Sequence, residues 1–235
     1  SSCKKHPQFL AVPLSVNHPV ELLEYYINDS EANLIITTPE FEEKLKPLAD
    51  KLKKPLEIIN PQSLIQNEQP IDEDSLISHF PNGSFYKQSP ALIMYTSGTT
   101  SKPKGVIMSY SNLDAQVSTL QNAWNIQNND IILHSLPLHH VHGVINALLL
   151  PLSAGAKVIM LPRFDSDNVW TYLLNVNLPQ KDRVTCYMGV PTSYSYLIQE
   201  YDKLFSKSSQ MTEYIKTHCQ NKIRLMISGS APLPQ

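Results

Sequence analysis

The sequence predicts an α/β fold made mainly of parallel sheets flanked by helices. Short runs rich in β-branched and other apolar residues alternate with segments whose apolar residues recur at helical spacing. This alternation is typical of parallel strands that are joined by crossover helices. The 235 residues, 42% of them apolar, can form one sizeable domain or two small ones.

The first part of the chain is expected to alternate strand and helix. The run at residues 9–14 predicts a strand, and a helix is expected after His18, with Pro19 at its first position. Val20, Leu23 and Ile27 are expected to form the apolar face of this helix. The elements that follow are predicted to be a strand at 33–37, a helix at 40–53 and a strand at 56–59. Residues 60–89 are polar and contain three prolines, which predicts a surface connection.

The second part shows the sharper pattern. Strands at 91–95 and 106–108 are expected to flank a loop rich in hydroxyl side chains. A helix follows, with Ser109 or Ser111 as its N-cap and an apolar stripe made of Leu113, Val117, Leu120 and Trp124. Further strands are predicted at 131–133, 158–161, 184–188 and 223–227, and further helices near 139–153, 165–175 and 191–203.

Composition excludes several classes of function. Nineteen basic residues oppose twenty-one acidic ones and no run of like charge reaches five, so no nucleic-acid or membrane-surface partner is indicated. Three distant cysteines without a CxxC pair argue against a disulfide framework or structural zinc, and favour a reducing compartment. The longest apolar stretch, residues 144–152, is far shorter than the roughly 20 residues that span a bilayer. The N-terminal segment lacks the apolar core of a signal peptide, and the sequence indicates no oligomeric state.

Residues 96–105, TSGTTSKPKG, form the most informative loop because they follow an apolar strand directly. Gly98 lets the backbone approach an anion, the hydroxyl groups add donors, and Lys104 can place a positive charge on phosphates. Pro103 restricts Lys102 to extended conformations. The loop is no Walker A motif, since GxxxxGK[ST] is absent. By composition alone, a polar surface loop remains the alternative.

The order of these residues is more specific than their composition. YTSGTTSKPKGV, residues 95–106, resembles the phosphate-binding loop [ST]SG[ST]TGxPKGV of the acyl-adenylate-forming, or AMP-binding, family. The resemblance implies ATP binding, with Lys104 as a catalytic residue and Mg²⁺ held through ATP near Thr100. The implied ATP-binding residues are Thr96, Ser97, Gly98, Thr99, Thr100, Ser101, Lys102, Pro103 and Lys104. Ser101 replaces the family's usual glycine, so a positive φ there would strain or re-form the loop.

LPLHHVHG, residues 136–143, resembles the family's next motif, which opens a helix lining the acyl pocket. The resemblance implies that His140 is a catalytic residue and that His142 binds substrate. The alternatives are packed or exposed histidines, or a zinc site built from His139 and His142.

Two further segments resemble the family. RLMISGSAPLPQ, residues 224–235, is similar to the strand and turn against which adenine lies, with a wall made of Gly229, Ser230, Ala231 and Pro232. By sequence alone this segment is an ordinary exit from a strand. VPTSY, residues 190–194, is likewise similar to a family segment, although Pro191 equally suits the first turn of a helix.

Together these segments look most like the mitochondrial malonyl-CoA synthetase subgroup, which implies a small dicarboxylic acid as substrate. Its second carboxylate needs polar or basic partners. We expect these partners to be His142, Arg224 and Ser230, although Arg224 could equally be a surface charge. Tyr196 stands near a point where relatives that use malonate tend to carry a basic residue. The subgroup implies a mitochondrial location; without it, a cytoplasmic one is expected.

The implied reaction has two halves. The acid attacks the α-phosphate of ATP, with Mg²⁺ bound, to give an acyl-adenylate and pyrophosphate; the thiol of coenzyme A then displaces AMP. The likeness runs from Phe9 to the last residue, so we expect residues 1–235 to form part of the large N-terminal domain, without the C-terminal domain that carries a catalytic lysine. Two alternatives stay open: a non-catalytic, truncated nucleotide-binding paralogue, or a ligase for a medium-chain or aromatic acid.

Overall fold

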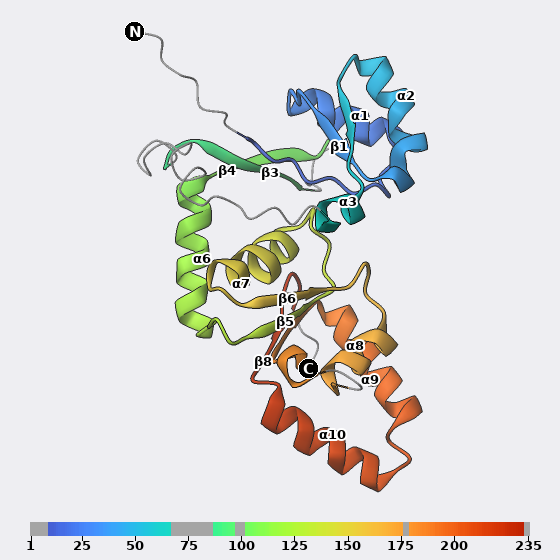
Figure 1. The fold of residues 1–235 in the computed structure, drawn as a ribbon, viewed down its shortest axis with the longest axis vertical. Coiled ribbons are helices and arrows are strands. Elements are labelled where there is room, and N and C mark those ends of the chain that lie inside the picture. Colours follow the sequence, from blue (N-terminus) through green and yellow to red (C-terminus); the bar gives the residue numbers. More distant parts are fainter. Residues whose placement is uncertain (1–8, 67–86, 97–101, 176–178, 233–235) are drawn as a thin grey trace. The chain divides into compact units, whose positions relative to one another are not determined.

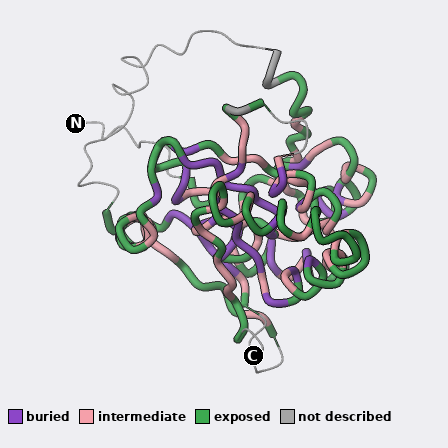
Figure 2. Tube along the Cα trace, turned by 90° about the horizontal axis from the view of Figure 1, so that it is seen from below, coloured by how far each residue is buried: buried purple, intermediate pink, exposed green. Residues whose placement is uncertain are grey.

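The computed structural model describes residues 9–66, 87–96, 102–175 and 179–232 (Figure 1). The chain divides into two compact units, Ser1–Asn112 and Leu113–Gln235, and each is described by itself. Continuous runs of buried residues lie at 91–94, 131–136 and 186–189, whereas the buried residues of the helices lie mostly on one side of each helix (Figure 2). The predicted α/β class is confirmed in both units.

The first unit begins with a small αβ layer. Its elements are α1 (Val20–Asp29), β1 (Ile35–Thr37), a 3₁₀ turn (Pro39–Phe41), α2 (Glu42–Leu52), β2 (Leu56–Ile58) and α3 (Pro61–Gln66). β1 and β2 pair in parallel, and Leu23 and Ile27 of α1 pack with Leu45 and Leu48 of α2 into one core. Pro19 was predicted as the first residue of α1, but it is the N-cap. Residues 60–89 were predicted as a surface connection, and α3 lies at the start of that segment.

The second sheet of this unit is antiparallel, in a fold whose other sheets are parallel. β3 (Pro90–Thr96) and β4 (Lys104–Ser109) are antiparallel, because residues 97–103 are too few for the crossover that parallel strands need. In place of the strand predicted at 9–14, the structure shows a single bridge from Ala11 to Leu92.

The second unit is a four-stranded, fully parallel sheet with helices on both faces. Its strands lie in the order β6 (Lys157–Met160), β5 (Ile131–His134), β7 (Cys186–Gly189) and β8 (Leu225–Ser228). Side chains that alternate along β5 and β7 point to opposite faces, so each face can bury its own cluster. The predicted strands at 131, 158, 184 and 223 are therefore confirmed, with shifts at their ends.

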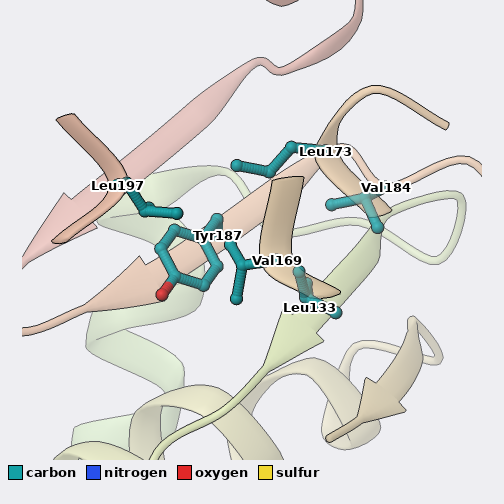
Figure 3. Packing of buried hydrophobic residues seen from close by; sticks show 6 residues of the cluster. All are labelled: Leu133, Val169, Leu173, Val184, Tyr187 and Leu197. Atoms are coloured by element: carbon teal, nitrogen blue, oxygen red, sulfur yellow. The ribbon is translucent and has the colours of Figure 1, made fainter. Parts of the chain in front are cut away.

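One face of this sheet is covered by α8 (Ser166–Leu173) and α9 (Pro191–Leu204), and Figure 3 shows six side chains of the cluster between them. They are Leu133, Val169, Leu173, Val184, Tyr187 and Leu197. The other face packs against α6 (Tyr110–Trp124) and α7 (Leu150–Ser153), through Val117, Leu120 and Trp124 of α6 and Leu150 of α7. The predicted apolar stripe thus does face the sheet.

The helix predicted near 139–153 has an unusual form. Residues His142–Leu149 are a π-helix, which passes directly into α7. Gly143 is required at its start, since a Cβ there would lie 2.1 Å from the carbonyl oxygen of Pro137. π-helical turns are rare and are frequent at functional sites.

Candidate nucleotide and carboxylate site

The described phosphate-loop candidates, Thr96 and residues 102–104, belong to the first unit, at the ends of β3 and β4 that the loop joins. Thr96 and Lys104 are the last paired residues of the two strands, and both are exposed. The ladder therefore fixes both ends of the loop and presents Lys104 beside them. Ser97, Gly98, Thr99, Thr100 and Ser101 lie outside the described residues, so their roles stay predictions.

The residues just before Lys104 contact α1. The carbonyl oxygen of Pro103 accepts a hydrogen bond of 2.9 Å from the Tyr25 hydroxyl, and the Lys102 ammonium lies 5.5 Å from the centre of the Tyr25 ring. Sequence reasoning did not anticipate Tyr25, because its partners are distant in the chain. Lys102 is exposed, but its charge is directed at an aromatic face.

In the second unit, the candidate residues gather at the carboxyl ends of the parallel strands. His142, at the start of the π-helix, is buried, and its Nδ1 lies 3.2 Å from Ser230 Oγ, just after β8. Gly229 lies against the same ring, since a Cβ on it would be 3.0 Å from His142 Cε1. Ligands of open parallel sheets bind at this edge. The structure thus brings together His142, Gly229 and Ser230.

A second histidine, His134, bonds the residue that follows His142. His134, at the end of β5, accepts the Leu136 N–H at Nδ1 (3.2 Å), so its Nε2 carries the proton that goes to the Gly143 carbonyl (2.9 Å). Burial lowers the pKa of His134, which agrees with this neutral tautomer. The bond ties the first turn of the π-helix to the sheet.

His142 is also held neutral. Burial, with a smaller contribution from His134, lowers its pKa below the ordinary value of 6.5. When the Ser230 hydroxyl donates to Nδ1, the proton of the neutral ring is on Nε2. That nitrogen is buried and has no hydrogen-bond partner among the described residues. It is therefore available as a donor to a ligand oxygen.

Two residues that the sequence analysis did not single out share this property. Asn146 Oδ1 and Ser228 Oγ are buried atoms without a hydrogen-bond partner in the described part of the chain. They lie on the same two segments as His142 and Ser230. A buried polar atom left unpaired costs about 1–3 kcal/mol, so such atoms mark positions for a ligand or water. The signal in the sequence was a lone amide inside the apolar run 144–152.

His139 and His140, the other histidines of the LPLHHVHG segment, lie outside this contact. His140 is exposed, with its ring centre 4.3 Å from that of His139, and its backbone N–H bonds the Pro137 carbonyl at 3.3 Å. Its catalytic role therefore stays a prediction. Within the described ranges, no group of three or more His, Cys, Asp and Glu side chains could hold a metal ion.

Arg224 does not join His142 and Ser230. Arg224 precedes β8 and Ser230 follows it, so Arg224 lies at the amino end of this strand and Ser230 at its carboxyl end. Arg224 Nε donates to Asp130 Oδ1 at 2.7 Å, and Nη1 and Nη2 donate to the carbonyls of Trp124 and Asn125. All of these partners lie near the amino ends of the strands or at the end of α6, which indicates a structural role.

The turn after β8 has a strained backbone. Ser230 has a φ of +69°, a conformation that favours glycine, while Ala231 and Pro232 are exposed. Backbone strain of this kind is often found at functional sites, and here it accompanies the contact between Ser230 and His142. The turn presents small side chains, as the predicted adenine wall requires.

Comparison with known proteins decides the family. The family model described as AMP-binding enzyme matches residues 8–235. The chain belongs to the AMP-binding enzyme family. Within this family it is similar to the mitochondrial malonate–CoA ligase ACSF3 of Mus musculus, with 43% identity over 230 residues, and to the malonate–CoA ligase of Arabidopsis thaliana, with 36% identity over 236 residues.

The chain spans only part of these AMP-binding relatives. Each comparison covers 96% of this chain but 37% of the relative. Among solved structures, ATP-bound MatB from Rhodopseudomonas palustris superimposes with a TM-score of 0.70 at 30% identity, over 95% of this chain and 40% of that one. In the described residues, no helix is both long and apolar enough to cross a membrane.

Proposed function

We propose that this chain takes part in the ATP-dependent activation of malonate to its coenzyme A thioester. The observation that carries the proposal is the buried His142 ring at the carboxyl ends of the parallel strands. Its Nε2 has no hydrogen-bond partner among the described residues. A neutral imidazole donor suits the second carboxylate of a small dicarboxylic acid. The relatives named as malonate–CoA ligases support the same substrate.

The first half-reaction requires positioning and charge neutralisation and no enzyme nucleophile. One carboxylate oxygen of the acid forms a bond to the α-phosphorus of ATP, and the bond to the bridging oxygen breaks so that pyrophosphate leaves. Lys104, exposed at the end of the ladder, is the residue we assign to the charge on the departing phosphates. His140 is assigned to the carboxylate that reacts.

The second half-reaction transfers the acyl group. The sulfur of coenzyme A attacks the acyl carbon, the bond to the AMP oxygen breaks, and the thiol proton passes to solvent. Gly229, Ser230, Ala231 and Pro232 are the residues we assign to the face of adenine, because this turn carries small side chains and Ala231 and Pro232 are exposed. Mg²⁺ would supply positive charge to the phosphates, and Thr100 is the residue proposed near it.

We further infer that residues 1–235 form part of the large N-terminal domain of such a ligase, since the chain spans 37% of the length of its mouse relative.

A mitochondrial location is proposed from the name of the mouse relative alone. Imaging of a tagged full-length protein beside a matrix marker tests this, and a diffuse cytoplasmic signal would contradict it.

A second candidate is an acid with a single carboxylate. It is favoured by the position of Arg224, whose side chain bonds Asp130 near the amino ends of the strands, and by Tyr196, which offers only a hydroxyl. An oxalate–CoA ligase of Arabidopsis thaliana, 30% identical over 229 residues, supports a small dicarboxylic acid instead.

The test is pyrophosphate release by the full-length protein that carries this sequence, with ATP, Mg²⁺ and a panel of malonate, oxalate, butyrate, octanoate and benzoate. We expect malonate to give the highest kcat/KM. His142→Ala should raise the KM for malonate at least tenfold while changing that for butyrate less than threefold. His218→Gln, on α10 (Ser209–Lys222), serves as the matched control. Release with butyrate or benzoate but not malonate would favour the second candidate, and ATP binding without release would indicate a non-catalytic paralogue.

A further inference from the structure

The aromatic residues of α1 form a contact with the nucleotide loop that the proposed function does not use. The Tyr25 hydroxyl donates to the Pro103 carbonyl at 2.9 Å across 78 positions of sequence. That carbonyl belongs to the peptide unit whose nitrogen is the backbone nitrogen of Lys104. The hydrogen bond therefore limits rotation of the peptide that leads into the lysine.

The base of this contact is firmly packed. Tyr25 lies beside Tyr26 and Tyr95, with ring centres 5.7 Å and 6.3 Å away, and Tyr26 and Tyr95 are 4.2 Å apart. The Tyr95 hydroxyl donates to Asp29 Oδ2 at 2.7 Å, so both ends of the cluster are anchored in α1. Gly105 faces Tyr95 across the hairpin, and its missing Cβ leaves room for that ring.

Lys102 adds a second contact to the same tyrosine. Its ammonium group lies 5.5 Å from the centre of the Tyr25 ring, within the range of a cation–π interaction. Tyr25 therefore contacts both residues that precede Lys104, one through its hydroxyl and one through its face. The side chain of Lys104 has neither contact and remains exposed.

We propose that Tyr25 is a positioning residue, which holds the Lys102–Pro103 segment so that Lys104 is presented to the phosphates of ATP. The proposal rests on the proposed role of the loop in ATP binding. Tyr25 acts through Lys104 and does not itself touch the nucleotide. Its loss should slow the chemical step, which depends on the placement of the lysine charge, more than it weakens ATP binding.

The first experiment is a double-mutant cycle in the full-length protein. Tyr25→Phe removes only the hydroxyl, and we expect kcat for pyrophosphate release to fall five- to twentyfold while the KM for ATP changes less than twofold. In a Lys104→Ala background the same change should have no further effect, because there is no lysine left to position. Tyr110→Phe is the matched control, since its hydroxyl also donates to a distant carbonyl, that of Phe9 at 3.3 Å.

A second experiment does not depend on activity. Trypsin cleaves after lysine but not before proline, so Lys104–Gly105 is the cleavable bond of this segment and Lys102–Pro103 is not. Tyr25→Phe should raise the rate of cleavage after Lys104 severalfold in the folded protein, followed by mass spectrometry, and Tyr110→Phe should not. Equal cleavage rates, or an additive loss of kcat in the Lys104→Ala background, would overturn the proposal. If no acid supports release in the wild type, the proposed function fails while cleavage still tests Tyr25.

Discussion

At the scale of single residues, the structure gives different surroundings to the two lysines of one motif. Both Lys102 and Lys104 were predicted to bind ATP, but Lys102 lies over the ring of Tyr25 and Lys104 ends the β3–β4 ladder. The pattern KPK could not reveal this, because the aromatic partner comes from a helix far away in the sequence. The two lysines should therefore contribute unequally to catalysis.

Replacing Lys104 by alanine should lower kcat for pyrophosphate release by about 10²-fold and change the KM for malonate by less than threefold. A charge that interacts chiefly with the leaving phosphates stabilises the transition state more than the bound acid. Steady-state kinetics of the full-length protein measure both values, and Lys102→Ala is the matched control. Unchanged pyrophosphate release would remove Lys104 from the mechanism.

The two buried histidines should make stability depend on pH. Burial lowers the pKa of His134 and of His142 below 6.5, so the unfolded chain binds their protons first as the pH falls. Their contribution is complete above about pH 6.5 and is lost towards the lower folded-state pKa, by at most about 1.4 kcal/mol per pH unit for each group. Urea unfolding at pH 7.5 and 5.5 should show lower stability at pH 5.5; equal free energies would contradict this.

At the scale of elements, local signals predicted well whatever depends on neighbours in the sequence. The stripe along α6 and the strands of the parallel sheet were found from periodicity alone, and Ser109 was one of two predicted caps. Two features of the fold were not found from the sequence pattern. The direction in which β3 and β4 pair was not predicted, and α10 (Ser209–Lys222) was missed because Ile215 is its one buried residue.

Ser109 is the cap that the structure selects for α6. Its Oγ accepts the Asn112 N–H at 3.2 Å, and its own N–H donates to Asn112 Oδ1 at 3.0 Å. Ser109→Ala should reduce the free energy of unfolding by about 1 kcal/mol, whereas Ser111→Ala should cost clearly less. Chemical denaturation compares the two variants, and an equal or larger loss for Ser111→Ala would contradict the assignment.

At the scale of the whole chain, the sequence predicted those site residues that belong to a family motif and also lie at the carboxyl ends of the parallel strands. His142, Gly229 and Ser230 come together because both of their segments leave the carboxyl edge of one sheet. Arg224 was grouped with them because the second carboxylate of the acid needs a polar or basic partner. A strand, however, advances about 3.3 Å per residue, so β8 carries the two to opposite edges.

Arg224 is instead expected to stabilise the second unit. Asp130 is only 4% exposed, and although burial alone would raise its pKa, hydrogen bonds from Arg224, Gln127 and Thr185 hold that pKa below 3.8. Arg224→Met would leave this carboxylate without its partner and should cost about 3 kcal/mol. The KM for malonate should stay within twofold of wild type.

Thermal and urea unfolding of Arg224→Met measure the loss, and the double variant Asp130→Asn/Arg224→Met should recover part of it, because the unpaired charge is then removed. A large rise in the KM for malonate with unchanged stability would instead return Arg224 to the substrate pocket.

The π-helix at His142–Leu149 makes this part of the chain sensitive to length as well as to composition. A π-turn holds one residue more than an α-turn, so deleting one residue between Val144 and Leu149 would let the segment relax into an ordinary α-helix. His142 opens this segment and α7 follows it, so the relaxed helix would displace His142 relative to Ser230. Such a protein would keep its sheet yet lose recognition of the acid, so natural variants of this gene that differ by one codon here should differ in activity far more than in solubility.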